Sequence, residues 1–240
     1  MKILTWLQAS ARHYRQTQTP LREKFYSSLA ALCGILLLVL AESLLASEFT
    51  LSLPVLASMG ASAFLLFVVP HSPMAQPWPM FAGHLLASVI GVLCAQTIAQ
   101  PALAVAAAVG LAIFCMYFLR CLHPPSAATA MIAVLGGPQV HALGWSFCYE
   151  VVAINAGILL LLAFIINNLV PGRRYPLRHS HHPHHAQFVQ QSHPAALELD
   201  EADFEAALAR MDGVIDVTPE DLVDIYEFAV ENAEARRKPA

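Results

Sequence analysis

The sequence predicts an all-α bundle of helices that spans a membrane. Of the 240 residues, 57% are hydrophobic and only 12% are charged, whereas soluble domains carry about a quarter charged residues. The charges are also segregated, because the stretch from Phe25 to Gly172 holds a single basic residue, Arg120, and only three acidic ones. This composition excludes a soluble globular domain over that stretch.

Six apolar segments are candidate membrane spans, since a helix needs about 20 apolar residues to cross a hydrocarbon core of about 30 Å. They are residues 25–46, 50–69, 83–99, 101–119, 122–137 and 145–170. The first and last are long and continuous, but the second contains Pro54 and Gly60, and the fifth opens with Pro124-Pro125. We expect six spans, two of them interrupted; a four-span arrangement is the alternative if neither interrupted segment crosses.

The basic residues predict how the chain is oriented. Five lie in the first 24 residues, Arg120 follows the fourth segment, and Arg173 and Arg174 follow the sixth. With six spans these groups share one side, which the positive-inside rule assigns to the cytosol. We therefore expect a protein of the bacterial inner membrane with both termini cytosolic. The expected domains are a basic head (1–24), a transmembrane domain (25–172), a His/Pro-rich linker (173–196) and an acidic helical tail (197–240).

Two windows indicate an internal duplication, residues 54–63 and 120–129. Each lies in the middle segment of a three-span group and combines small residues with a helix-breaking element. Because three is odd, the second group must be inverted in the membrane, as in many transporters. The amino ends of the two interrupted helices would then face each other, and such ends attract anions. The alternative is that Gly60, Ala61, Ser62 and Ala63 form only a small-residue packing face.

These patterns select the candidate binding residues. The interrupted segments contribute Gly60, Ala61, Ser62, Pro124, Pro125, Ser126 and Thr129. His123 could donate to an anion or respond to pH, with His71 or His84 as possible companions. Arg120 is either a selectivity charge or a marker of the cytosolic side. Glu150 and Asn155 on the last segment could line the same pathway.

The stretch from His123 to Ala130, His-Pro-Pro-Ser-Ala-Ala-Thr-Ala, resembles the signature of the HPP family of integral membrane proteins. Four further elements agree: Gly60–Ala63, Pro70–Pro77, Gly83-His84 and Arg174-Tyr175-Pro176. The resemblance covers about residues 20–178. It implies a membrane protein usually described as four-spanning. Plant members are associated with nitrite transport into chloroplasts, so it also implies permeation of a small anion.

The expected function is therefore a channel or transporter for a small monovalent anion, with nitrite the first candidate. No enzyme activity is expected, because the transmembrane stretch shows no Ser-His-Asp spacing, phosphate-binding glycine loop or metal-ligand set, and its five cysteines lack Cys-x-x-Cys spacing. We expect no cofactor, no metal and no nucleic acid; the expected partners are the bilayer, the anion and, through small-residue faces, further copies of the chain. The alternative is a non-transporting sensor or scaffold whose acidic tail binds a partner.

Overall fold

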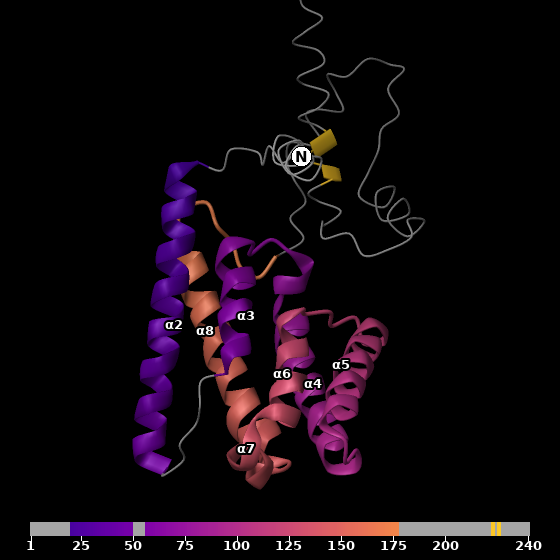
Figure 1. Cartoon of the computed structure of the whole chain (residues 1–240). Helices are drawn as coiled ribbons and strands as arrows, with labels where there is room; N and C mark the ends of the chain where they lie inside the picture. The colour runs from indigo at the N-terminus through magenta and orange to yellow at the C-terminus, as the bar shows by residue number, and fades with distance from the viewer. Residues whose placement is uncertain (1–19, 50–55, 178–221, 224, 227–240) are drawn as a thin grey trace, which may run out of the picture.

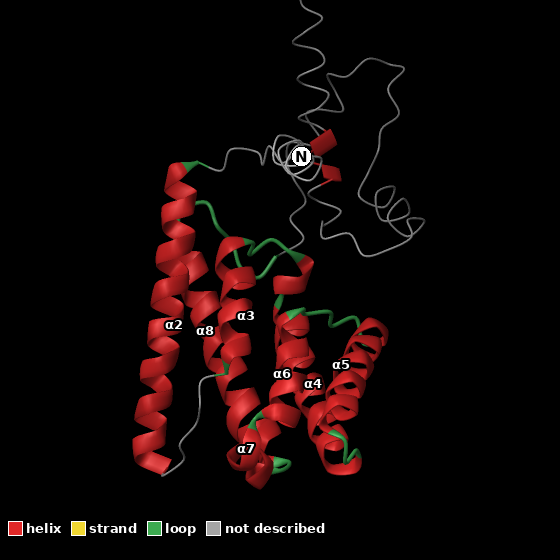
Figure 2. Ribbon diagram, viewed as in Figure 1, coloured by secondary structure: helices red, strands yellow, loops and turns green. Residues whose placement is uncertain are grey.

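A computed structural model describes residues 20–49, 56–177, 222–223 and 225–226 (Figure 1). Every regular element within these ranges is a helix (Figure 2), which confirms the predicted all-helical membrane bundle. The expectations for the head before residue 20, for the His-rich linker from residue 178 and for most of the acidic tail lie outside the described residues.

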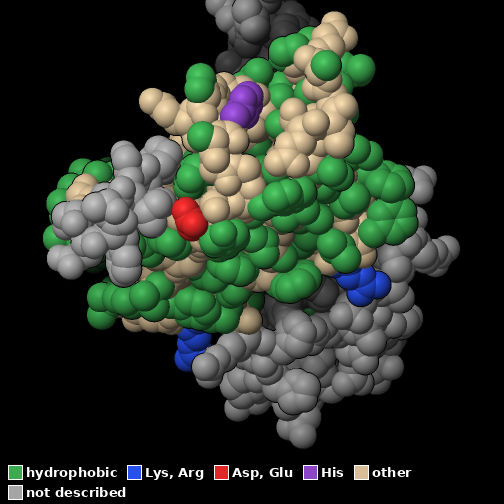
Figure 3. Space-filling view, turned by 90° about the horizontal axis from the view of Figure 1, so that it is seen from below, with side chains coloured by type: hydrophobic (Ala, Val, Ile, Leu, Met, Phe, Trp, Pro, Cys, Tyr) green, Lys and Arg blue, Asp and Glu red, His purple; other side chains and the backbone are tan. Residues whose placement is uncertain are grey.

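Four helical units are long and apolar enough to cross a membrane. They are α2 (Leu21–Phe49), α4 (Pro77–Thr97), α5 (Pro101–Phe118) and the continuous pair formed by the π-helical η2 (Phe147–Ala153) and α8 (Ile154–Leu169). Many large apolar side chains on these helices are exposed, which suits contact with lipid. At the end of the bundle that is seen from below, hydrophobic side chains also cover far more of the described surface than charged ones do (Figure 3).

The two segments that the sequence marks as interrupted form short helices. Helix α3 (Ala57–Val68) has 12 residues and α6 (Pro125–Leu135) has 11. At about 1.5 Å per residue each is about half the thickness of the hydrocarbon core. Pro125 occupies the first turn of α6, where its missing N–H costs nothing, and Gly136 follows the last residue. Two smaller elements complete the body, the 3₁₀ turn η1 (Pro73–Ala75) and α7 (Gly137–Leu143).

The six main helices alternate in direction along the bundle (Figure 1). The triplet α2, α3 and α4 therefore runs in the opposite sense to the triplet α5, α6 and α8, and the short helix is second in each. This order matches the predicted inverted repeats. The start of α2 and the end of α8 lie at the same end of the bundle.

One expected feature of the repeats is wrong. The amino ends of α3 and α6 do not meet at a common point, because the two helices lie side by side and antiparallel. Ser62 contacts His123, just before α6, while Ser58 contacts Thr129, further along it. The reason is that each short helix packs along its length against its neighbours, so that side chains, and not helix ends, meet at the centre.

Helix α6 lies directly against α4 through small residues. An added Cβ at Gly91 would lie 2.6 Å from the Cβ of Ala133, and one at Gly83 would lie 2.9 Å from the carbonyl oxygen of Cys121. Only hydrogen side chains allow this approach. The close contact brings His123, in the loop just before α6, next to His84 on α4.

A buried guanidinium joins three helices at the end where the chain enters and leaves the bundle. Arg173, 7% exposed, forms a salt bridge with Glu23 on α2. It also donates to Ser27 Oγ at 2.6 Å, to the Phe67 carbonyl of α3 at 3.0 Å and to Asn167 Oδ1 of α8 at 3.1 Å. These bonds fix the positions of α2, α3 and α8 at this end.

Candidate functional site

Two imidazoles and two hydroxyls meet in the interior of the bundle. Ser62 Oγ lies 2.8 Å from His84 Nε2 and 2.9 Å from His123 Nε2. His84 Nδ1 lies 2.7 Å from Thr129 Oγ1. The four side chains come from α3, α4, the loop before α6, and α6, and none is more than 1% exposed. We call Ser62, His84, His123 and Thr129 the histidine cluster.

Two further groups bound the histidine cluster. At one end, the Thr129 hydroxyl donates to Ser58 Oγ at 2.9 Å. At the other end, His123 Nδ1 lies 2.8 Å from the carbonyl oxygen of Met74. A carbonyl can only accept, so this nitrogen carries a hydrogen and donates it. A neutral His123 therefore presents an unprotonated Nε2 to Ser62.

The Met74 carbonyl is held in place by the loop around η1. Met74 N–H donates to Ser72 Oγ, and the Gln76 side-chain amide donates to the carbonyls of Pro70 and Ser72. From the far end of the chain, the Tyr175 hydroxyl donates to the Ala75 carbonyl at 2.7 Å. Burial raises the pKa of Tyr175, so that the hydroxyl keeps its hydrogen. Two of the segments that carried the family resemblance, Pro70–Pro77 and Arg174–Pro176, thus form one hydrogen-bonded support for His123.

An open cavity of about 330 Å³ lies beside the histidine cluster. It lies between η1, α5 and the start of α6, and His123, Met74, Met116 and Pro124 contribute to its walls. Such a volume admits a small ligand. The walls are mostly apolar, and His123 is the cluster residue that reaches them.

The amino end of α6 differs from a simple anion site. Pro125 has no N–H, and the amides of Ser126 and Ala127 donate to the carbonyls of His123 and Pro124 at 2.9 and 3.1 Å. The hydroxyl of Ser126, by contrast, is buried without a hydrogen-bond partner. Since buried polar groups are normally paired, this hydroxyl is a donor that is available to a bound ligand.

The structure brings six of the predicted site residues together. Ser62, His123 and Thr129 belong to the histidine cluster, and Pro124, Pro125 and Ser126 form the turn that leads from it into α6. Their proximity follows from the antiparallel contact of α3 and α6. The prolines act through the backbone, because they set the angle at which His123 enters the interior.

The other five predicted residues lie elsewhere. Gly60 and Ala61 are on the exposed side of α3, and an added Cβ at Gly60 would meet nothing within 4 Å. Arg120 is exposed in the turn after α5, with a positive φ of 51°. Glu150 is partly exposed on η2. The Asn155 side chain is occupied, since its Oδ1 accepts from Leu56 N–H at 3.1 Å and its Nδ2 donates to the Val151 carbonyl at 3.0 Å.

Several groups were not among the predicted binding residues. His84 was considered only as a companion of His123, as was His71, which the structure leaves exposed in the turn after α3. Ser58 carried a weak signal, because it stands four residues before Ser62 and so shares its helix face. The Met74 carbonyl carried none, since a backbone atom leaves no mark in a sequence.

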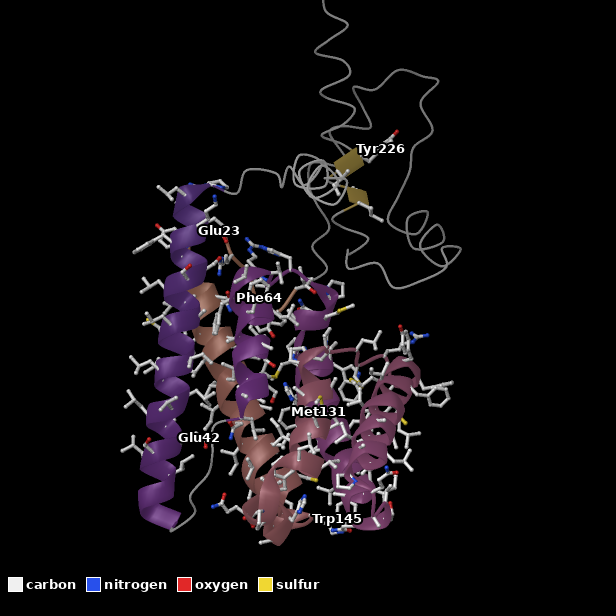
Figure 4. All side chains as sticks on the ribbon, in the orientation of Figure 1. Glu23, Glu42, Phe64, Met131, Trp145 and Tyr226 are labelled. Carbon is white, nitrogen blue, oxygen red and sulfur yellow. The ribbon has the colours of Figure 1, made fainter. Side chains whose placement is uncertain are left out.

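Glu42 on α2 is a buried acidic residue outside the histidine cluster. Its side chain is only 2% exposed (labelled in Figure 4). Both carboxylate oxygens are buried without a hydrogen-bond partner. Acidic groups within a membrane are costly and are usually functional.

Within the described ranges, no three His, Cys, Asp or Glu side chains gather in a way that could hold a metal ion. The arrangement of the histidine cluster suits the exchange of protons instead, because imidazole and hydroxyl groups both donate and accept hydrogen bonds.

The fold and this buried cluster define a polytopic helical membrane protein whose polar centre lies between two half-length helices. The chain belongs to the HPP family, whose transmembrane region matches residues 16–176.

Two relatives are described as transmembrane proteins of Dictyostelium discoideum. One is 37% identical over 176 residues, which is 72% of this chain and 61% of the relative. The other is 37% identical over 161 residues, which is 65% of this chain and 51% of the relative. The chain thus spans about half to three fifths of the length of these relatives. No solved structure matches the chain.

Proposed function

We propose that this membrane protein transports a small monovalent anion, with nitrite as the first candidate, and that the histidine cluster is the central site on the path. The observation that carries the proposal is the Ser62 hydroxyl shared by two buried imidazoles, His84 and His123. Polar groups inside a membrane bundle are expensive and mark ion or substrate pathways. Resemblance to plant family members associated with nitrite supports the choice of anion.

The surroundings of the cluster favour a site through which an anion passes, and not one that binds it tightly. The cavity of about 330 Å³ gives a ligand access to His123, and the unpartnered Ser126 hydroxyl offers a donor in the adjoining turn. The helices and turns that form the cluster contain no Asp, Glu or Lys, and their one arginine, Arg120, is exposed. A conducting site must bind weakly enough to release its ion, and a site built from neutral donors meets that need.

The proposed orientation has both termini of the chain on the cytosolic side of a bacterial inner membrane. Arg22, Lys24, Arg173 and Arg174 lie where α2 begins and α8 ends, at the same end of the bundle. The positive-inside rule supports a cytosolic place for this end.

Nitrite uptake into proteoliposomes tests the proposal. We expect purified wild-type protein to increase uptake well above that of protein-free vesicles. His123→Gln should reduce the increase by about tenfold or more, the effect of losing about 1.4 kcal/mol of stabilisation on the path. His71→Gln, a change of the same kind at an exposed turn, should behave as wild type. Folded protein that moves neither nitrite, nitrate nor chloride would refute the proposal.

A further inference from the structure

The hydrogen bonds of the histidine cluster can be counted proton by proton. His123 Nδ1–H donates to the Met74 carbonyl. The single hydroxyl hydrogen of Thr129 goes to Ser58, so Thr129 Oγ1 must accept from His84 Nδ1–H. With both rings neutral, each Nε2 is therefore an acceptor.

Both Nε2 atoms face the same hydroxyl. Ser62 Oγ lies 2.8 Å from one and 2.9 Å from the other, and it also lies 3.2 Å from the Ser58 carbonyl oxygen, to which it can donate. A hydroxyl carries one hydrogen, so in this arrangement at least one Nε2 lone pair must face an oxygen lone pair. A proton added to either Nε2 removes the conflict, because that imidazolium donates to Ser62 and Ser62 donates to the other ring.

A second complete arrangement needs no added proton. If the hydroxyls of Ser58 and Thr129 rotate, the Ser58 hydroxyl donates to Thr129 Oγ1 and the Thr129 hydroxyl donates to His84 Nδ1. His84 then carries its hydrogen on Nε2 and donates it to Ser62 Oγ. The Ser62 hydroxyl in turn donates to His123 Nε2. Hydroxyl hydrogens rotate freely to suit their partners. The cluster thus has two states in which every nitrogen of both rings is hydrogen-bonded, and these states differ by one proton.

No described residue supplies a counter-charge to the protonated state. The titratable or charged groups on the elements around the two rings are Cys94 on α4, Cys148, Tyr149 and Glu150 on η2, Cys115 and Tyr117 on α5, and Arg120 and Cys121 in the next loop. Within the described ranges, none of them hydrogen-bonds to either imidazole. A buried cation without a partner is strongly disfavoured, whereas an anion beside it would neutralise the charge.

We propose that the histidine cluster binds one proton together with the anion, so that the transport inferred above is proton–anion symport. The inference rests on the proposed function. Each ligand lowers the cost of binding the other, because imidazolium and anion cancel each other's charge in a medium of low dielectric constant, and such coupling is reciprocal. The proton forms an N–H bond at His84 Nε2 or His123 Nε2 on entry and leaves that nitrogen on exit, with no other bond made or broken.

Proteoliposomes loaded with a pH-sensitive dye test the coupling. With equal nitrite on both sides and a more acidic exterior, wild-type protein should drive nitrite inward and carry one proton per anion. Protein-free vesicles at the same pH correct for nitrous acid that crosses unaided. His84→Gln should reduce the protein-dependent proton entry by about tenfold or more, while His71→Gln should match wild type. Nitrite flux without proton entry would overturn the symport inference and leave the proposed function standing; absence of any anion flux would overturn both.

A second measurement reads the protonation of the two rings directly in wild-type protein and does not depend on flux. In wild-type protein with ¹⁵N-labelled histidine in lipid nanodiscs, nitrite added at constant pH should convert an unprotonated Nε2 signal to a protonated one. The cluster signals are those missing from the spectra of His84→Gln and His123→Gln. An Nε2 signal that stays unprotonated as nitrite binding saturates would overturn the inference, even if nitrite is transported.

Discussion

Asn155 and Asn167, both on α8, hold the two ends of α3. Asn155 Oδ1 accepts from the Leu56 N–H at the start of α3, and Asn167 Nδ2 donates to the Leu66 carbonyl near its end at 3.0 Å. The two asparagines are 12 positions apart on α8, close to the 10 positions that separate Leu56 from Leu66 on α3. This spacing lets α8, which runs parallel to α3, supply the partners that a short helix inside a membrane lacks at its ends.

Asn167→Leu should destabilise the protein. The Leu66 carbonyl would normally accept from the residue four positions later, but that residue is Pro70, which has no N–H. Without Asn167 this buried carbonyl loses a donor, at a cost of about 1–2 kcal/mol. Thermal unfolding in detergent should show a lower midpoint than wild type, whereas Gln100→Leu, at an exposed amide in the turn before α5, should not. An unchanged midpoint for Asn167→Leu would show that α8 is not needed to cap α3.

Glycine-to-alanine changes should separate packing from helix propensity. Gly83→Ala and Gly91→Ala place a methyl group within 3 Å of α6 or its preceding loop, so we expect a loss of about 1–3 kcal/mol from overpacking. Gly110→Ala on α5 meets nothing within 4 Å and should stabilise its helix by up to about 1 kcal/mol. Denaturation in detergent provides the comparison, and equal effects at the three sites would contradict the close contact of α4 with α6.

Replacement of Arg173 should not be rescued by another positive charge. Arg173→Lys removes the planar donor set that reaches Glu23, Ser27 and the Phe67 carbonyl together, and it should cost about 2 kcal/mol. The neighbouring Arg174 is exposed, so Arg174→Lys should leave the unfolding midpoint unchanged. If Arg173→Lys has wild-type stability, the charge alone matters and the geometry does not.

The hydroxyl of Thr129, more than its shape, should matter for transport. Thr129→Val keeps the volume but removes the acceptor of His84 Nδ1, so nitrite flux should fall by about tenfold or more, corresponding to about 1.4 kcal/mol. Thr129→Ser keeps the hydroxyl and should retain most of the flux. Equal flux from the valine and serine variants would show that the hydrogen bond between Thr129 and His84 is not needed for transport.

The buried carboxyl of Glu42 should destabilise the folded protein. Glu42→Gln removes a charge that is buried without a partner, and we expect it to stabilise the folded protein by about 1 kcal/mol or more at neutral pH. Glu150→Gln, at a partly exposed site, serves as the control and should have little effect. A destabilised Glu42→Gln would show that this carboxylate has a partner when the protein lies in a bilayer.

Membrane residence and helical class follow from the sequence, because they depend on composition and on the length of apolar segments. The same reasoning located the two interrupted segments, since Pro124-Pro125 and Gly136 act on the backbone locally. It did not place Asn155, which was expected on a pathway but caps α3 instead. Nothing local in the sequence says which way a polar side chain on a long apolar helix will face.

The sequence by itself determined that this chain is a helical membrane protein with two interrupted apolar segments, because those properties are set by residues close together in the chain. The tertiary structure alone decided that Ser62 stands between His84 and His123, residues 22 and 61 positions away. This contact depends on how α3, α4 and α6 are rotated and shifted against one another. The close approach of α4 to α6 at Gly83 and Gly91, and the asparagines that cap α3, set that arrangement. Contacts between helices arise from packing across the whole bundle, and so no single segment encodes them.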